Sequence, residues 1–269
     1  MPTTLDAPTR SAPSPARRWT RRRSMTFEHA TTAAQPSYLG TTGLPRLRLV
    51  NGSLEALKWF ALLLMLGDHI NKYLLHDSAQ ALFNAGRLVM PIFAIVLGYN
   101  LARPGKLASG VYPRVLTRLA VVGAVSSIPF IALGGLGWGW WPLNVMTALG
   151  LVTASLWLFD LGGPARVASG VALLVVGGFF VEFWWAILAI AVAAWLYVRR
   201  PRWSALGLAA IGFAGLHLVN RNEWALAALP LIALASCVDL SVPRMRWAFY
   251  AFYPLHLTLI WAVRLLAMG

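Results

Sequence analysis

From Leu54 to the carboxyl end, the sequence alternates apolar runs with short polar breaks. A helix needs about 20 mainly apolar residues to cross the hydrocarbon core of a bilayer. Of the 269 residues, 58% are hydrophobic and 12% are charged, whereas roughly 25% are charged in an ordinary soluble domain. The chain is therefore predicted to be an all-α, polytopic integral membrane protein with about nine transmembrane helices. The runs lie near residues 54–75, 86–102, 112–133, 142–160, 166–181, 183–199, 203–219, 224–239 and 246–266, and the span count stays open around Glu182.

The basic residues in the polar breaks predict how the helices are oriented, because Lys and Arg concentrate in cytoplasmic loops. With the amino terminus inside, the cytoplasmic breaks contain Arg103, Lys106, Arg166, Arg199, Arg200, Arg202, Arg244 and Arg246. The opposite breaks, HDSAQALFNAG, GGLGWGWWP and NRNE, contain only Arg221. This alternation predicts an odd number of spans and a carboxyl terminus outside. The net charge of +14 thus follows the membrane topology, and direct nucleic-acid binding is not expected.

Residues 1–49 differ in composition from the rest of the chain. They are rich in Arg, Pro, Ser and Thr and contain eight of the 23 basic residues. We predict a disordered cytoplasmic tail at 1–49, because it lacks the apolar surface for a core, and a transmembrane domain at 50–269. The arginine cluster precedes no apolar h-region, so it is not expected to be an export signal. Met1 and Met25 are both candidate start residues.

The most unusual stretch is GDHINKY, residues 67–73, inside the first predicted span. At a rise of 1.5 Å per residue, Asp68 and His69 lie about 15 to 17 Å from Lys58, near the centre of the hydrocarbon core. A charge at that depth costs at least about 2.5 kcal/mol on insertion scales and marks a functional site by default. We therefore expect Asp68 and His69 to face protein or a water-filled cavity.

The last span brings a second histidine to the same depth. His256 lies about 15 Å from the inner end of its helix, and the neighbouring Pro254 removes a backbone donor, which predicts a kink. Arg87 opens the second span from the outer side, and its long side chain would reach down toward Asp68. We predict a polar site formed by Asp68, His69, Arg87 and His256 that opens outward.

Each of these residues also has a structural interpretation. Asp68 would pair with Lys72 or Arg87 only to fix the packing of helices. A lone His256 would be a hydrogen-bonded core residue, and Glu182, near the outer boundary, is more typical of a structural or interfacial position. The single cysteine, Cys237, excludes a disulfide framework or a multi-cysteine metal site. No metal is expected.

Three motifs occur together in the chain: a DH pair in the first span, GRL-x-x-P-x-F at the start of the second, and YPLH near the end. With LEALKWFALLLMLGDHINKYL, AGRLVMPIFAIVLGYNLARPG, RVLTRLAVVGAVSSIPFIALGGLGWGWWPLN and AFYPLHL, they resemble the TraX family of conjugal-transfer membrane proteins. Within that family the sequence resembles the TrbP proteins of broad-host-range conjugative plasmids. The resemblance covers roughly residues 50–266 and is weakest between the fourth and last spans.

The resemblance implies a membrane-bound N-acetyltransferase whose fold is similar to multi-span membrane acyltransferases. It implies that acetyl-coenzyme A donates an acetyl group to the amino terminus of the pilin subunit, in the bacterial inner membrane beside other conjugation and mating-pair proteins. Asp68, His69, Arg87 and His256 match the family's polar positions. In that chemistry His69 is the base, His256 a second base or a donor to the carbonyl oxygen, Arg87 stabilises the oxyanion and Asp68 sets the local field.

The acetyl group would have to cross the membrane, because the coenzyme is cytoplasmic and the mature pilin presents its amino terminus outside. Residues at the inner mouth are expected to hold the coenzyme's phosphates by charge-assisted hydrogen bonds: Arg103, Lys106, Arg114 and Arg118. Cytoplasmic positive charge alone also explains Arg114 and Arg118. Direct transfer is favoured over an acyl-enzyme, because Cys237 lies away from the polar site, and an acyl-histidine stays open.

Three other functions fit the same sequence. In the first, a non-enzymatic assembly factor for conjugative transfer uses the polar centre only to hold its helices. The second is an acyltransferase that acts on a glycan or lipid, which would need a larger polar groove on the outer face. The third is a small transporter with intramembrane proton sites, which the lack of a detectable inverted repeat disfavours.

Overall fold

The computed structural model describes residues 43–135 and 137–268. These residues form α1 (Asn51–Tyr73), α2 (Gln80–Gly86), α3 (Val89–Ala102), α4 (Val111–Ala132), α5 (Val145–Leu161), α6 (Pro164–Gly177), α7 (Trp184–Arg199), α8 (Trp203–Asn220), α9 (Ala228–Cys237) and α10 (Arg246–Met268). Short 3-10 turns, η1 (Gly178–Phe180) and η2 (Trp224–Ala227), precede α7 and α9. With α2 and α3 counted together, the described residues contain nine helical segments and no strand, as predicted. Most of the predicted tail, residues 1–42, lies outside the described part of the chain.

Within the described residues, four segments are long and apolar enough to cross a membrane. They are residues 80–102, 111–132, 203–220 and 247–267, and the shorter apolar helices run over 145–161, 164–180, 184–199 and 224–237. α1 has 23 residues but carries four charges along its length, Glu55, Lys58, Asp68 and Lys72. The all-helical, multi-span membrane class is therefore confirmed, and the charges of α1 must be accommodated within the bundle.

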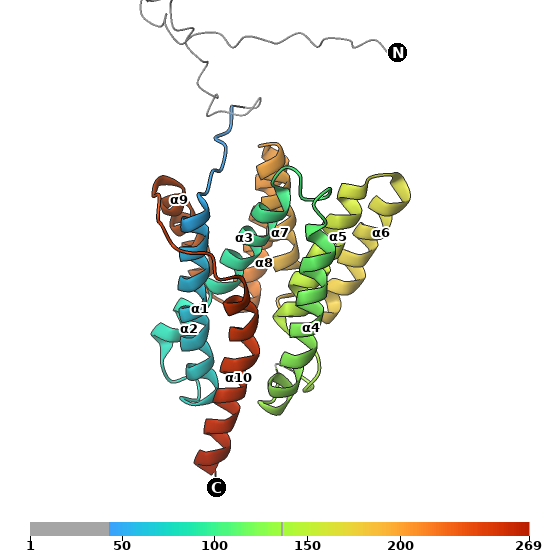
Figure 1. The fold of residues 1–269 in the computed structure, drawn as a ribbon. Coiled ribbons are helices and arrows are strands. Elements are labelled where there is room, and N and C mark those ends of the chain that lie inside the picture. The colour runs from blue at the N-terminus through green and yellow to red at the C-terminus, as the bar shows by residue number, and fades with distance from the viewer. Residues whose placement is uncertain (1–42, 136, 269) are drawn as a thin grey trace, which may run out of the picture. The chain divides into compact units, whose positions relative to one another are not determined.

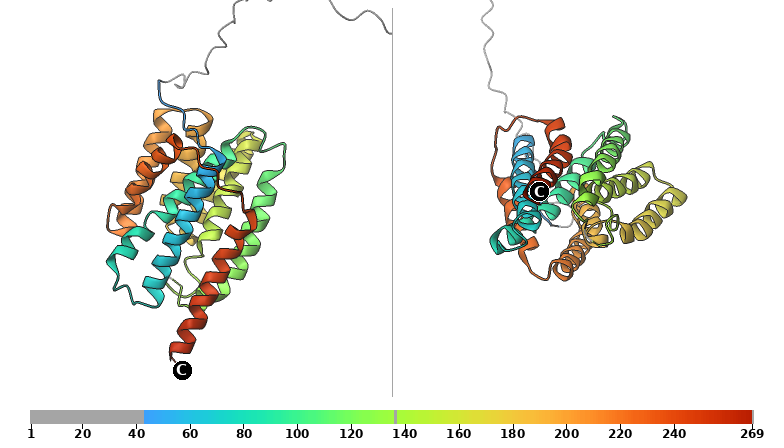
Figure 2. Two further views of the ribbon diagram at one scale, coloured as in Figure 1. Left: turned by 60° about the vertical axis from the view of Figure 1, so that its left-hand side comes forward. Right: turned by 90° about the horizontal axis from the view of Figure 1, so that it is seen from below.

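The helices run roughly side by side in a bundle with α3 near its centre (Figure 1, Figure 2). α3 packs against α1, α5, α7 and α9, and most of its residues are buried. α10, the last helix in the chain, packs against α1 and α4. This arrangement places the first and last helices beside each other, so that residues almost 190 positions apart in sequence come into contact.

The sequence prediction is wrong for one segment. Residues 80–86 were expected in a loop, yet they form α2, which packs against α1. A turn at Arg87 and Leu88 separates α2 from α3. Pro91 fits the first turn of α3, where its missing N–H removes no helical hydrogen bond. The turn therefore brings Arg87 alongside the middle of the bundle.

Two connections position residues of the site. In the connection before α10, the Leu240 carbonyl oxygen lies where a Cβ on Gly52 would be, only 1.5 Å away, so that only glycine fits under this crossing. In the connection between η1 and α7, Val181 forms an isolated parallel bridge with Leu143. The N–H of Glu182 donates to the Leu143 carbonyl at 3.0 Å, which fixes the backbone of Glu182 next to the start of α5.

Candidate active site

Two cavities of about 410 Å³ each lie within the described part of the bundle. The first, which we call the histidine cavity, has as polar lining Asp68, His69, Lys72, Asp77, Arg87, Glu182 and Asn220. The second, the basic cavity, contains the cations Lys58, Arg103, Lys106, Arg114, Arg118 and Arg244. Both cavities are lined by Met65, Met90, Val145 and Tyr253. The two spaces therefore meet at a common, largely apolar wall.

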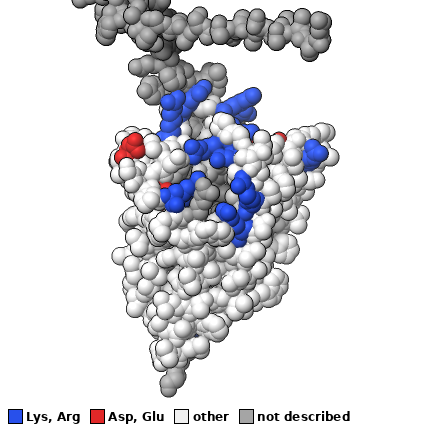
Figure 3. All heavy atoms as spheres, viewed as in Figure 1, with Lys and Arg blue, Asp and Glu red and all other residues white. Residues whose placement is uncertain are grey.

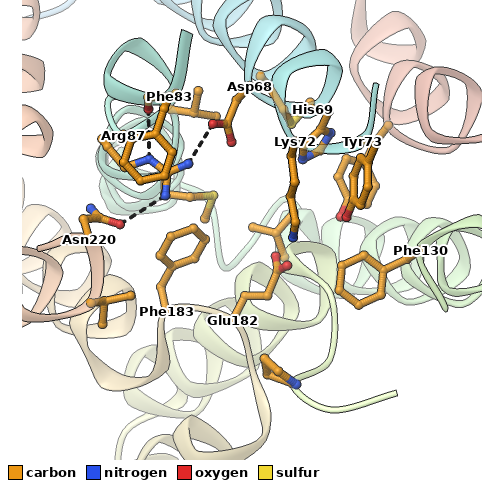
Figure 4. Close-up of a pocket in the computed structure, with 18 of the residues that line it drawn as sticks. Asp68, His69, Lys72, Tyr73, Phe83, Arg87, Phe130, Glu182, Phe183 and Asn220 are labelled. Carbon is orange, nitrogen blue, oxygen red and sulfur yellow. Dashed lines mark hydrogen bonds and ion pairs between the residues drawn. The ribbon is translucent and has the colours of Figure 1, made fainter. Parts of the chain in front are cut away.

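Asp68 and Arg87 form an ion pair on the wall of the histidine cavity (Figure 4). Nη2 of Arg87 lies 2.7 Å from Oδ1 of Asp68, Nε donates to the Phe83 carbonyl at 3.1 Å, and Nη1 lies 3.4 Å from Oδ1 of Asn220. The guanidinium also lies over the Phe83 ring, 4.3 Å from its centroid. The predicted reach of Arg87 to Asp68 is confirmed, and the partner of Asp68 is Arg87 rather than Lys72.

The structure explains why the GRL motif begins with a glycine, Gly86. A Cβ at this residue would lie 2.4 Å from Cγ and 2.5 Å from Oδ1 of Asp68. Contacts this short force a displacement, so a side chain at residue 86 is incompatible with the observed position of the Asp68 carboxylate. Glycine lets α2 approach α1 closely enough for the ion pair to form.

His69 and His256 contact each other directly, as their equal predicted depth suggested. Nδ1 of His69 lies 2.7 Å from Nε2 of His256, and the rings are stacked with their planes 8° apart. Nδ1 of His256 lies 2.8 Å from the Phe252 carbonyl oxygen, which can only accept. In the neutral tautomers that satisfy both contacts, His256 donates to Phe252 and His69 donates to His256. His69 then keeps a lone pair at Nε2.

The two histidines differ in their access to the cavity. His69 is part of its lining, whereas His256 is buried behind it with 4% of its surface exposed. A neutral imidazole whose N–H is held by a fixed acceptor has one nitrogen free to accept a proton. The geometry therefore leaves Nε2 of His69 able to accept a proton, with the ring oriented by a second histidine.

Glu182 belongs to the site, although the sequence favoured a structural or interfacial role for it. The residue lies in the connection between η1 and α7, outside both helices, and 8% of its surface is exposed. Burial raises the pKa of its carboxyl group to about 7, an effect that the positive charge of Lys72 opposes. Figure 4 shows the Lys72 side chain extending from α1 toward the Glu182 carboxylate. The four predicted residues therefore share their site with Glu182 and Lys72.

The four predicted phosphate-binding residues, Arg103, Lys106, Arg114 and Arg118, all line the basic cavity. Lys58 and Arg244 also line the basic cavity, although the sequence placed them only at the inner membrane boundary. Glu55, which is 4% exposed, contacts both of them, with Oε1 at 2.7 Å from Nζ of Lys58 and 3.8 Å from Nε of Arg244. Figure 3 shows Lys and Arg side chains around a hollow at one end of the bundle. The basic cavity thus concentrates positive charge from four separate segments.

Cys237 is exposed at the end of α9 and lines neither cavity. Its predicted separation from the polar site is therefore confirmed. Nucleophilic chemistry in the histidine cavity would have to use a group other than this thiol.

The fold and the two cavities define a multi-span helical membrane protein with a histidine pair at its centre and a cationic cavity beside it. The model of the TraX protein family matches residues 53–264, and the chain belongs to the TraX family, a family of conjugal-transfer proteins. It is similar to Protein TraX of Escherichia coli, 28% identical over 222 residues that cover 78% of this chain and 86% of that protein. It is also similar to Protein TraX of Escherichia coli strain K12, 27% identical with the same coverage. No solved structure matches the chain.

Proposed function

We propose that this protein is a membrane acetyltransferase that transfers an acetyl group from acetyl-coenzyme A to the amino terminus of the pilin subunit. It would act in the bacterial inner membrane with other mating-pair proteins. The observation that supports this proposal is the meeting of the two cavities. One contains a base suited to deprotonate an amine, the other contains cations suited to phosphates, and both are lined by Met65, Met90, Val145 and Tyr253.

The donor would bind in the basic cavity. Its cations come from α1, the α3–α4 connection, α4 and the segment before α10. Arginine and lysine there would bind the phosphates by charge-assisted hydrogen bonds. The thioester end of the donor would then extend to the common wall of the two cavities, within reach of an acceptor in the histidine cavity.

The acceptor amine would be activated by His69. An α-amino group has a reference pKa of about 7.7 to 8.0 and must lose a proton before it attacks a thioester. Nε2 of His69 accepts that proton, the neutral amine nitrogen bonds to the acetyl carbon, and the carbon–sulfur bond breaks. The proton on His69 passes to the leaving thiolate, and the second proton that the nitrogen loses on becoming an amide is released to water, so that the histidine returns to its starting form. His256 holds His69 in the required tautomer throughout.

The Asp68–Arg87 pair would serve this reaction electrostatically. The Arg87 guanidinium lies on the cavity wall, where its positive charge favours the negative charge that develops on the carbonyl oxygen. Asp68 holds the guanidinium in place through the 2.7 Å contact. A pre-oriented charge stabilises a transition state without a cost of reorganisation during the reaction.

The intact mass of mature pilin tests the proposal. Pilin would be isolated from cells that carry the wild-type gene, a His69→Ala version, a His217→Ala version or no gene, at matched expression. His217 is a control because its side chain is half exposed at the end of α8 and lines neither cavity. We expect one added acetyl group with the wild type and His217→Ala only. Equal masses in all four samples would refute pilin acetylation, and the assembly-factor function would then be tested through conjugation itself.

A further inference from the structure

Glu182 has a fixed position in the histidine cavity. Its backbone is held by the Leu143–Val181 bridge and by its N–H bond to Leu143, and the backbone N–H of Val145 faces its carboxylate. The side chain is directed into the cavity, opposite α1 (Figure 4). A carboxylate held in this way can recognise a ligand without rearrangement of its own backbone.

The charged residues around the cavity leave Glu182 without a direct ion pair. Among the described residues, the lining contains three carboxylates, Asp68, Asp77 and Glu182, and two cations, Lys72 and Arg87. Asp68 is paired with Arg87, and Asp77 lies in an exposed loop. Lys72 extends toward Glu182 and is the cation that acts on it most strongly (Figure 4). The buried member of the set, Glu182, forms no ion pair within 4.0 Å in the described part of the chain.

The lack of a direct ion pair has a consequence for Glu182. A buried carboxylate is costly unless a cation in contact with it or a proton neutralises it. A proton meets this need when no cation is in contact, in agreement with the pKa of Glu182, which burial raises to about 7. A ligand that brings one positive charge would replace the proton.

The remaining walls indicate what surrounds that charge. Aromatic side chains also line the cavity, namely those of Tyr73, Phe130, Trp141, Phe183 and Trp184. Aromatic faces attract cations and also bury apolar groups. The site therefore suits an ammonium group followed by an apolar segment, which a sugar hydroxyl does not provide.

We infer that Glu182 binds the ammonium group of the acceptor, so that the protein selects a primary amine at the end of an apolar peptide and rejects a hydroxyl acceptor. This inference rests on the proposed acetyl transfer and names its acceptor subsite. The ammonium group docks on Glu182 as R–NH₃⁺ and gives one proton to Nε2 of His69. The neutral amine formed is the nucleophile, and Glu182 itself forms no covalent bond.

Binding without turnover tests the inference independently of acetylation. The probe is a short apolar peptide with a free α-amino group, and its partner probe has a hydroxyl in place of that amino group. Both would be titrated into full-length protein in detergent, with no acyl donor present. We expect Glu182→Gln to weaken binding of the amine peptide by at least about tenfold, while binding of the hydroxyl peptide stays weak and unchanged.

Two further variants separate charge from structure. Glu223→Gln is the matched control, because Glu223 is 74% exposed and lines neither cavity, and it should bind the amine peptide like the wild type. Glu182→Asp keeps the charge and should recover part of the affinity. Equal binding of the amine peptide by wild type and Glu182→Gln, or tight binding of the hydroxyl peptide by the wild type, would overturn the inference. A purely structural effect would also overturn the inference. In that case Glu182→Gln would lose both its affinity for the amine peptide and its folded state, as judged by thermal unfolding, and Glu182→Asp would restore neither the affinity nor the folded state.

The turnover assay then distinguishes failure of this inference from failure of the proposed function. If the wild type binds the amine peptide through Glu182 but transfers no acetyl group to it, the acceptor subsite stands and acetyl transfer fails. If the wild type acetylates the peptide and Glu182→Gln has an unchanged KM for it, acetyl transfer stands and the role of Glu182 fails. For a true acceptor subsite we expect the KM for the peptide to rise and the KM for acetyl-coenzyme A to stay the same.

Discussion

Replacement of Gly86 by alanine is the sharpest test of the geometry, because it adds one carbon atom at a defined place. The new Cβ would lie 2.4 Å from Cγ of Asp68, 2.5 Å from Oδ1 and 2.6 Å from Cβ. Relief of these contacts requires a movement of about 1 Å, since carbon atoms pack at about 3.5 to 4.0 Å. The carboxylate cannot move this far and keep its 2.7 Å contact with Nη2 of Arg87. The ion pair must therefore weaken or α2 must move away from α1.

The size of the effect follows from the burial of the pair. The side chains of Arg87 and Asp68 are partly buried, at 16% and 18% exposed, so breaking their ion pair is expected to cost about 3 kcal/mol, the lower end of the range for buried pairs. Alanine is favoured over glycine within a helix by about 1 kcal/mol, which offsets part of that cost. We expect a net loss of about 2 kcal/mol in the free energy of unfolding, together with a marked loss of acetyl transfer.

The assay is equilibrium unfolding of the full-length protein in detergent micelles, followed through helical circular dichroism. Gly207→Ala is the matched control, because Gly207 also lies in a helix and a Cβ there would meet no atom within 4 Å. That variant should be unchanged or more stable by up to about 1 kcal/mol. If Gly86→Ala is as stable and as active as Gly207→Ala, the close approach of α2 to Asp68 is not required and the reasoning fails.

Two further substitutions test the two cavities separately. Replacing His256 by Leu removes the acceptor that orients His69, and we expect kcat for acetylation to fall by roughly 10²-fold or more with little change in either KM, whereas His217→Leu should match the wild type. Arg118→Gln should raise the KM for acetyl-coenzyme A by about tenfold and leave the KM for the peptide unchanged, whereas Arg166→Gln should change neither, because Arg166 is exposed in the first turn of α6 and lines neither cavity. A change in either KM in the His256 variant, or a change in the KM for the peptide in the Arg118 variant, would contradict the roles proposed for these two residues.

The common depth of the two histidines could be predicted from the sequence because it depends on helix geometry. A helix rises by a fixed distance per residue, and this rule places His69 and His256 at one depth from the ends of α1 and α10. A membrane restricts the possible tilts and excludes unpaired charges from the lipid face. The direct contact between the rings, 2.7 Å from nitrogen to nitrogen, follows from the packing of α1 against α10. The reach of Arg87 toward Asp68 could be predicted for the same reason, because Arg87 begins the span that follows the span of Asp68.

Glu182 could not be assigned in this way, because it lies in a non-helical connection. No fixed rise applies there, and its place depends on the bridge between Leu143 and Val181. Lys58 and Arg244 were missed for a different reason. Basic residues at the inner ends of helices are already explained by topology, so their sequence positions carry no further information. Only the buried carboxylate of Glu55, which contacts both, shows that they belong to one cavity.

The proposed transfer places opposing demands on the wall between the two cavities. An acetyl group must pass it, whereas an open aqueous path would let protons cross the membrane. The side chains that line both cavities, those of Met65, Met90, Val145 and Tyr253, are mostly apolar. Methionine is unbranched and has three rotatable bonds, so it can move aside for a narrow group and close again behind it. A wall of this composition meets both demands, because it yields to the end of an acyl chain and still offers water few hydrogen-bonding partners.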